Sequence, residues 1–408
     1  MVPNVALGEL LDLSQYGLSV SSVDGGQYPM FKMNNFANGF MSDNGVDTVD
    51  LEYEEFSKYQ LEYGDILFNR TNSIDLVGKT GVFTLKGNYV FASYLVRLKV
   101  NKEIADPFFL NYFMNFDGTK LRLRSLATKA VSQANINPTQ LKKLLRVPLF
   151  PLPEQRKIAQ ILSTWDRGIA TTEKLIDASK QQKKALMQQL LTGKKRLVDP
   201  ETGKTFEGEW EEVKLGDVAA MNSGGTPKSS VSKYYDGIHP WVSIADMTKH
   251  GKWISKTEKS LTDEGISNSS ARLYPKGTVL YAMYASIGEC SISTVELCSS
   301  QAILGIRPKD NLINIYLYYY LVNLKEKIIL TGQQGTQSNL NAGMVKGFNI
   351  KLPTVVEQQK IASVLTAADK EIELLETKLA HLKQEKKALM QQLLTGKRRV
   401  QVSETEAA

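Results

Sequence analysis

The sequence KKALMQQLLTGK occurs twice in this chain of 408 residues, at 183–194 and at 386–397. The likeness extends upstream, because residues 154–196 align without a gap on residues 357–399 and 24 of these 43 positions are identical. A repeat of this length does not arise by chance. The chain is therefore two copies of one unit, each with a module followed by this segment.

Each repeated segment has the heptad pattern of a long helix. Apolar residues recur at alternating steps of four and three from Ile158 to Leu190, and again from Ile361 to Leu393. Seven of these ten positions are apolar in the first copy and nine of ten in the second, which predicts a coiled-coil seam. The simplest partner for one seam is the other, so we expect the two helices to pair antiparallel.

The length and the interruptions of the helices carry further expectations. Pro153 stands where a helix start tolerates a missing amide hydrogen. A helix over residues 154–191 would be about 57 Å long at a rise of 1.5 Å per residue. Lys183 and Lys386 interrupt the two seams at equivalent positions. We expect them to reach water or to fix the register, with contact to a partner chain as the alternative.

The composition is that of a globular protein. No window holds the 18 or so uninterrupted apolar residues of a membrane span, and the N-terminus lacks the basic and apolar start of a secretory signal. We therefore expect a cytoplasmic protein with no membrane contact. The net charge of +7 and the pI near 9.0 favour an anionic partner, although only weakly.

Motifs for catalysis or metal binding are missing from the sequence. Two cysteines, Cys290 and Cys298, and three histidines offer no zinc pattern, and no phosphate-binding loop or nucleophile elbow is present. The string Asp106-Pro-Phe-Phe lacks the second proline of an adenine-methyltransferase motif, and the repeat aligns it with INIYLYYYLV. We interpret it as a helix start and predict no catalytic residue, metal site or cofactor in this chain.

The sequence predicts that the modules before the helices are mixed α/β domains. Strand-like runs at 64–68, 81–85 and 89–100 in the first module correspond to runs at 277–284 and 302–306 in the second. The two modules keep their elements in one order but have diverged almost completely in sequence. This pattern is expected where a scaffold is fixed and the surface facing a target differs.

Polar loops in the modules are the candidate contacts to nucleic acid, with ordinary solvated turns as the alternative. In the first module the loop after the strand at 64–68 and the segments 16–22 and 28–36 supply Ser19, Ser21, Lys32, Asn34, Asn69, Arg70, Thr71, Asn72 and Lys79. In the second module the segment SGGTPKSS, HPWVSIADM and the end of the strand at 277–281 supply Thr226, Lys228, Ser229, Ser243, Tyr281, Tyr284 and Ser286.

A third group of polar residues is shared by the two modules. It consists of Gln133, Asn135 and Asn137, matched by Gln337, Asn339 and Asn341. Residues that are the same in both modules cannot by themselves read two different sequences. We therefore predict structural turns, or contacts shared with a partner or with the DNA backbone.

The combined motifs resemble one protein family. GGTP followed by YYDGIHPWVSIADM, then QSNLN, then EQQKIASVL leading into KKALMQQLLTGK are similar to the specificity subunit of type I restriction-modification systems. The resemblance covers essentially the whole chain. The first module departs from it, because YGLSVSS at 16–22 stands where GGTP is expected.

The resemblance implies an α/β fold in which two mixed α/β target-recognition domains are held apart by two long antiparallel coiled-coil helices, with an internal pseudo-twofold repeat. The expected parts are recognition domains at 1–152 and 213–353, long helices at 153–193 and 354–396, a linker at 194–212 and a basic, flexible tail at 397–408.

The resemblance also implies the role. Each domain would read one half of an asymmetric site in double-stranded DNA, and the helices would set the spacer and dock two methyltransferase subunits. Partner subunits would use S-adenosylmethionine to methylate adenine, and restriction subunits would use ATP and magnesium. Two alternatives remain from the residues alone, a coiled-coil adaptor that binds only protein and a self-sufficient methyltransferase.

Overall fold

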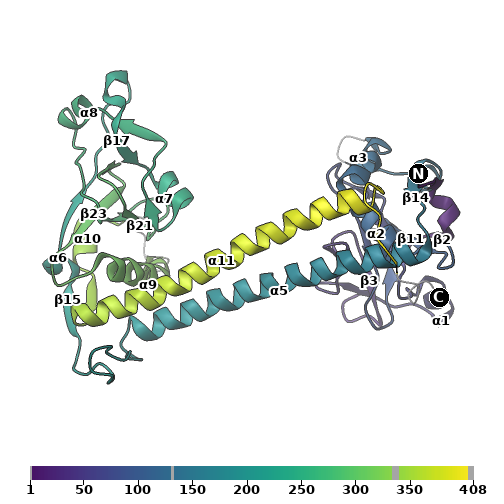
Figure 1. Cartoon of the computed structure of the whole chain (residues 1–408), viewed down its shortest axis with the longest axis horizontal. Helices are drawn as coiled ribbons and strands as arrows, with labels where there is room; N and C mark the ends of the chain where they lie inside the picture. Colours follow the sequence, from purple (N-terminus) through teal and green to yellow (C-terminus); the bar gives the residue numbers. More distant parts are fainter. Residues whose placement is uncertain (1, 130–132, 333–339, 403–408) are drawn as a thin grey trace. The chain divides into compact units, whose positions relative to one another are not determined.

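The computed structural model describes residues 2–129, 133–332 and 340–402. Its contacts divide the chain into two compact units, of which unit 1 is Met1–Glu173 with Thr377–Ala408 and unit 2 is Lys174–Glu376. Each unit holds one module together with one half of each long helix, labelled α5 and α11 in Figure 1.

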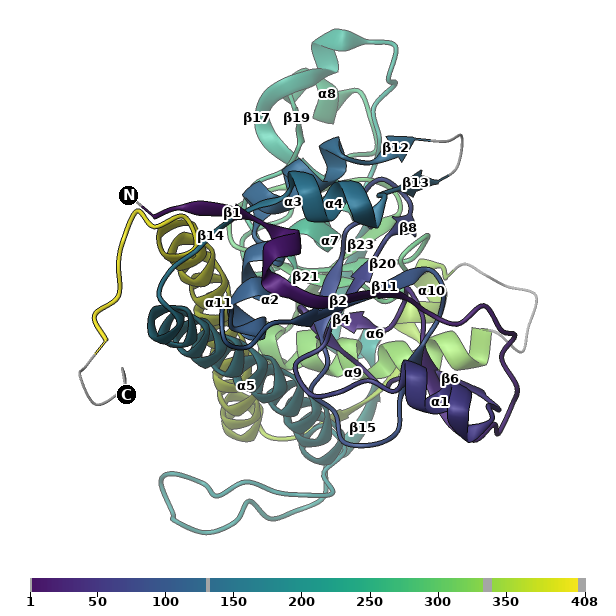
Figure 2. The same ribbon diagram turned by 90° about the vertical axis from the view of Figure 1, so that its right-hand side faces the viewer.

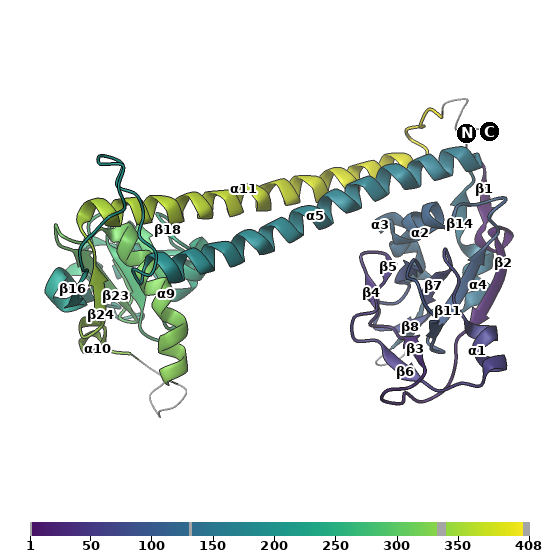
Figure 3. The ribbon, with the colours of Figure 1, turned by 90° about the horizontal axis from the view of Figure 1, so that it is seen from below.

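The two predicted long helices are confirmed. Helix α5 spans Leu152–Leu190 and helix α11 spans Val355–Leu393, 39 residues each. They run side by side (Figures 1 and 3), and in unit 1 Asp166 pairs with Lys386 while Glu173 pairs with Lys383, so they are antiparallel. All ten seam positions of each helix are buried or half-buried, as the heptad pattern predicts.

The first module is built on a six-stranded sheet with two three-stranded sheets and one two-stranded sheet beside it. The large sheet has the order β2 (Leu11–Tyr16), β11 (Leu95–Val100), β7 (Ile66–Asn69), β9 (Thr80–Val82), β5 (Phe40–Met41), β4 (Phe36–Ala37). The smaller sheets are β10 (Val90–Phe91), β3 (Tyr28–Phe31), β6 (Asp47–Val49); β12 (Thr128–Lys129), β13 (Ala134–Asn135), β8 (Thr71–Asn72); and β1 (Asn4–Ala6), β14 (Arg146–Pro148).

The second module repeats most of this plan. Its five-stranded sheet has the order β16 (Ala219–Ser223), β23 (Ile303–Pro308), β20 (Val279–Ala282), β21 (Cys290–Ser293), β18 (Trp253–Ile254). The smaller sheets are β19 (Lys259–Leu261), β17 (Tyr235–Val242), β22 (Cys298–Ser299); and β15 (Glu211–Lys214), β24 (Asn349–Leu352). Strand β15 begins two residues before the predicted module start at 213.

The shorter helices also correspond in pairs. Helix α2 (Pro107–Asn115) matches α9 (Asn314–Gly332), and α4 (Pro138–Leu144) matches α10 (Ala342–Lys346). The others are α1 (Tyr53–Tyr59), α3 (Asp117–Ser125), α6 (Leu215–Val218), α7 (Ile244–His250), α8 (Asp263–Ser267) and the 3₁₀ turns η1 (Leu7–Leu10) and η2 (Ser232–Tyr234). Asp106 caps α2 by accepting a hydrogen bond of 2.9 Å from the Phe109 amide, which agrees with the predicted helix start.

Each module packs on the start of one long helix and on the end of the other. In unit 1, α2 lies against both helices (Figure 2), and Ile158 of α5 shares a core with Leu393 and Leu394. In unit 2, Ile361 of α11 shares a core with Leu190 and Leu191. Burying each leucine side chain contributes about 1.5–3 kcal/mol. This packing explains why the leucines of the LLTGK segment occur in both copies.

The repeated Glu-Gln pair at each helix start ties the helix to its module. The Gln155 carboxamide oxygen accepts a 2.9 Å hydrogen bond from the Asp106 amide, and Gln358 accepts one of the same length from the Ile313 amide. Glu154 binds Arg399, so this part of the predicted flexible tail is anchored in unit 1. Over the described residues, no helix combines the length and the apolar content that crossing a membrane requires.

Candidate nucleic-acid interface

The polar loop after β7 is joined to the shared turn of the first module. Residues Thr71–Asn72 form β8, which pairs antiparallel with Ala134–Asn135. The Ile136 amide donates a 2.8 Å hydrogen bond to the Arg70 carbonyl oxygen, and Thr71 Oγ1 lies 3.3 Å from Asn135 Oδ1. The structure therefore brings together two groups of residues that lie more than sixty positions apart in the sequence.

Arg70 stacks on an aromatic ring at this surface. Its guanidinium carbon lies 5.0 Å from the ring centroid of Tyr16, and the Tyr16 side chain is 50% exposed. Stacking limits the rotamers of arginine while leaving its outer nitrogens able to donate. This arrangement suits a contact to phosphate or to the acceptor edge of guanine.

The structure buries the side chains of two of the predicted contacts. Asn69 ends β7 and Tyr281 lies in β20, and both have no exposed area. β7 and β20 are interior strands of their sheets and every residue in them is buried, so neither face meets solvent. Burial raises the pKa of the Tyr281 hydroxyl, which is a property of a core residue.

The other candidates of the first module are at least partly exposed. Ser19, Ser21 and Asn34 lie exposed in the connections around β3, and Lys79 is exposed just before β9. Lys32 is half-buried and forms an ion pair with Asp47. A lysine that already has a carboxylate partner is a weaker candidate for phosphate than one without.

The GGTP segment of the second module is held by two aromatic side chains. The Trp241 indole donates to the Gly225 carbonyl at 2.9 Å, and the Tyr235 hydroxyl donates to the Pro227 carbonyl at 2.7 Å. A Cβ atom on Gly225 would lie 2.3 Å from the Ala271 amide nitrogen, so only glycine fits. This anchoring leaves three predicted residues exposed at the surface, Thr226, Lys228 and Ser229.

The remaining candidates of the second module have mixed environments. Ser243 caps α7 by accepting from the Asp246 amide at 3.2 Å, so its hydroxyl has a structural partner. Tyr284 is 37% exposed and Ser286 is half-buried. Between them Ala285 has a φ of 57°, a left-handed conformation that is rare for a residue with a side chain and marks a tight tip.

Two of the shared asparagines, Asn137 and Asn341, act as helix caps. Asn137 accepts a 2.8 Å hydrogen bond from the Thr139 amide at the start of α4, and Asn341 accepts one of 3.0 Å from the Met344 amide at the start of α10. Gln133 and Asn135 are exposed. Gln337 and Asn339 lie outside the described residues.

The two seam lysines form equivalent triads. In unit 1, Lys386 pairs with Asp166 at 2.5 Å, and Asp166 accepts a 2.6 Å hydrogen bond from Tyr112 of α2. In unit 2, Lys183 pairs with Asp369 at 2.5 Å, and Tyr319 of α9 donates to the same carboxylate. Each triad thus joins α5, α11 and a module helix. These contacts are consistent with the register role expected from the sequence, which stays a prediction.

Unit 2 adds a second lysine to its triad. The Lys252 ammonium lies 3.2 Å from Asp369 Oδ2 and 2.6 Å from the Tyr319 hydroxyl. Burial raises the pKa of Asp369, but the hydrogen bonds from Lys183 and Tyr319 and the nearby positive charges outweigh it, so the net pKa is lowered. For Lys252 burial dominates over the carboxylate and lowers its pKa.

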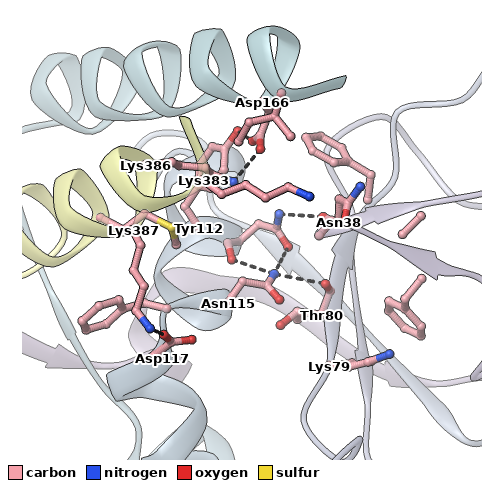
Figure 4. Close-up of a pocket in the computed structure, with 18 of the residues that line it drawn as sticks. Asn38, Lys79, Thr80, Tyr112, Asn115, Asp117, Asp166, Lys383, Lys386 and Lys387 are labelled. Atoms are coloured by element: carbon pink, nitrogen blue, oxygen red, sulfur yellow. Dashed lines mark hydrogen bonds and ion pairs between the residues drawn. The ribbon is translucent and has the colours of Figure 1, made fainter. Parts of the chain in front are cut away.

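A groove of about 770 Å³ opens between the first module and the helix pair within unit 1 (Figure 4). Its helix wall carries Lys383, Lys386 and Lys387, which pair respectively with Glu173, Asp166 and Asp117. Its module wall carries Asn38, Thr80, Asn115 and two further lysines, Lys79 and Lys120.

The equivalent groove of unit 2 is smaller, about 430 Å³. Its helix wall carries the repeat equivalents Lys180, Lys183 and Lys184. Backbone hydrogen bonds show which residues correspond on the module sides of the two grooves. The Val82 amide donates to the Gly39 carbonyl at 3.1 Å, and the matching Ile292 amide donates to the Lys252 carbonyl at 2.6 Å. Gly39 therefore stands in unit 1 where unit 2 has Lys252.

Sequence reasoning missed several residues of these surfaces. Tyr16 under Arg70, Asn38 and Lys120 in the groove, and Lys252 at the triad were not predicted. The basic run of α3, TKLRLRS, was the available signal for Lys120. The positions of Tyr16, Asn38 and Lys252 depend on strands that pair across long sequence separations. Such pairings leave no local pattern in the sequence.

The comparison with known families follows the duplication seen in the fold. The model for the type I restriction modification DNA specificity domain matches this chain twice, at residues 4–180 and 207–384. The chain belongs to the type I restriction-modification DNA specificity family. The resemblance predicted from the sequence motifs is thereby confirmed.

Relatives of this type I specificity subunit match along most of their length. The putative type I restriction enzyme MjaX specificity subunit of Methanocaldococcus jannaschii is 30% identical over 414 residues, covering 97% of this chain and 93% of the relative. The EcoR124I/EcoR124II specificity subunit of Escherichia coli is 23% identical and covers 78% of this chain and 84% of its own.

Solved structures share the fold. The S subunit of the type I restriction-modification system from M. genitalium has a TM-score of 0.57 at 16% identity, covering 97% of this chain and 96% of that one. The HsdS subunit from Thermoanaerobacter tengcongensis has a TM-score of 0.51 at 18% identity, covering 97% of both chains. This type I specificity subunit is the DNA-specificity part, not the catalytic part, of a restriction-modification complex.

Proposed function

We propose that this type I specificity subunit reads an asymmetric, bipartite site in double-stranded DNA, one half-site with each module. The observation that carries the proposal is the difference between the two copies. Their long helices and sheet orders repeat, whereas their exposed loops do not. In the first module Arg70 stacks on Tyr16, and in the second the GGTP loop presents Lys228 and Ser229 instead. Two different surfaces on one scaffold suit two different half-sites.

We assign these roles to the segments whose boundaries were predicted from the sequence. The recognition modules are residues 1–152 and 213–353, and the helices that set the spacer are 153–193 and 354–396. A linker at 194–212 joins the first helix to the second module, and 397–408 is the tail.

The long helices are also proposed to dock two methyltransferase subunits. Two leucines outside the seam support this role, because Leu175 and Leu374 are 48% and 62% exposed on α5 and α11. A partner subunit that covered these side chains would remove their apolar area from water, which favours docking. In this proposal the partner subunits bind S-adenosylmethionine, ATP and magnesium, restriction subunits join the complex, and the complex works in the cytoplasm.

Footprinting of the chain assembled with its methyltransferase subunits tests the two-module proposal. We expect two protected DNA segments with an unread spacer between them. A single continuous protected segment would contradict the two-module reading. No sequence-dependent protection at all would favour the alternative of an adaptor that binds only protein.

A further inference from the structure

The groove of unit 1 has a charge imbalance that its own residues do not neutralise (Figure 4). Five lysines and three carboxylates line it, which gives a net charge of +2. The three helix lysines use all three carboxylates in ion pairs. Lys79 and Lys120 of the module wall are left, and neither has an ion pair or a side-chain hydrogen bond in the described part of the chain.

Lys120 is the more constrained of these two lysines. It lies half-buried on α3, close to the positive charges of Lys386 and Lys79. Burial lowers its pKa, and the attraction of Asp117 does not offset this effect. Keeping this ammonium group charged therefore costs the folded chain free energy. An anionic ligand in the groove would offset that free-energy cost.

The duplicate groove differs from this one at the position of Lys79. The Asn69 amide donates to the Lys79 carbonyl, whereas the matching Ala282 amide donates to the Glu289 carbonyl, so unit 2 has a glutamate there. Among the described residues, the module wall of the unit 2 groove contributes Val322 and Asn323. There the extra cation, Lys252, already has Asp369 as its partner. A ligand shared by both copies, such as a methyltransferase subunit, would be expected to find the same wall twice. The unshared Lys79 instead indicates a ligand that differs between the two halves, which is the case for an asymmetric DNA.

The groove is continuous with the polar loop proposed to contact DNA. The Asn69 amide donates a 2.8 Å hydrogen bond to the Lys79 carbonyl, so Lys79 lies beside the strand that leads into Arg70. Asn38, also on the groove wall, is exposed and has a φ of 51°. Lysine and asparagine side chains are common donors to phosphate oxygens, and such contacts position a protein without reading bases.

We propose that this groove binds the sugar-phosphate backbone of DNA through Lys79, Lys120 and Asn38. The inference rests on the proposed DNA-reading function and assigns a backbone contact to the groove of the first module. It requires the affinity for every duplex, whatever its sequence, to depend on these side chains.

The test measures DNA affinity against salt for the chain assembled with its methyltransferase subunits. The variants are Lys79→Gln, Lys120→Gln and the double substitution, each with several duplexes of unrelated sequence. Each phosphate contact contributes about 0.9 to the slope of log K against log salt. We expect each single substitution to flatten the slope by about 1 and the double by about 2, with the same loss on every duplex.

Lys143→Gln is the matched control, because Lys143 is exposed on α4 of the same module and does not line the groove. It should leave the slope unchanged. Lys120→Gln should fold normally, since it removes a charge that burial disfavours, and an unchanged unfolding midpoint checks this.

Three outcomes would overturn the inference. The first is an unchanged slope in the double variant, and the second is equal flattening by the control. The third is loss of the methyltransferase subunits with DNA binding intact, which would assign the groove to an acidic protein surface. If the unaltered complex fails to bind any DNA, the proposed function itself is wrong, and this result is distinct from the other three.

Discussion

Asp166 and Asp369 occupy equivalent positions in the repeat but contact different numbers of lysines. Asp166 pairs with Lys386, whereas Asp369 pairs with both Lys183 and Lys252. The lysine side chains at Asp369 are only 24% and 11% exposed. Removing this carboxylate therefore leaves two partly buried cations close together.

We expect Asp369→Asn to lower the free energy of unfolding by about 2 kcal/mol, since hydrogen bonds to charged groups contribute about 1.5–3 kcal/mol each. The pKa of Asp369 is lowered in the folded chain, so its stabilisation is present above the ordinary carboxyl pKa near 3.8 and is lost as the pH falls below it. Urea unfolding of the full chain from pH 3 to 7 measures both effects.

Asp166→Asn is the control for this prediction. It should lower the free energy of unfolding by less, because it leaves one lysine without its carboxylate partner and not two. Equal losses in the two variants would show that Lys252 does not matter. A loss at Asp369 that stays constant as the pH falls from 7 to 3 would show that the carboxylate charge does not matter.

Single residues show where sequence reasoning about the interface fails. The predicted strand at 64–68 continues to Asn69, and its central place in the sheet buries both of its faces. Alternation along a strand separates buried from exposed residues only where one face meets solvent. The place of Arg70 directly after the strand was visible in the sequence, but its neighbour Tyr16 comes from β2, which no local pattern connects to it.

The long helices are the elements that the sequence predicts best. A heptad pattern with Pro153 near its start is a local signal, and α5 and α11 follow it closely. The two-residue strands β4, β5 and β18 have no such signal, since they depend on pairing with distant strands. Gly39 directly precedes β5 and Lys252 directly precedes β18, so their difference was not predicted.

Shortening both long helices by one heptad tests their role in spacing. Deleting residues 172–178 and 375–381 removes segments that are equivalent in the repeat and keeps each seam in phase. Seven residues span about 10.5 Å of helix, or about 3 base pairs of DNA. Sequencing of methylated adenines in cells that carry the variant should show unchanged half-sites and a spacer about 3 base pairs shorter. Altered half-sites with an unaltered spacer would show that the helices do not set the distance.

The whole molecule is a duplication in which the helices stayed alike and the module surfaces diverged. The likeness was visible in the sequence, because 12 consecutive identities at the helix ends leave no ambiguity. The shared sheet order was only partly visible, since its strands pair across long sequence separations. The duplicated grooves with different module walls became apparent only in the structure.

A module exchange tests whether each module reads one half-site of the DNA. Residues 213–353 are replaced by the corresponding module of a related specificity subunit, and methylated adenines are mapped genome-wide in cells that contain the partner subunits. We expect one half-site to change to that of the donor, while the other half-site and the spacer stay the same. A methylation pattern that is unchanged, or one in which both half-sites change, would contradict it.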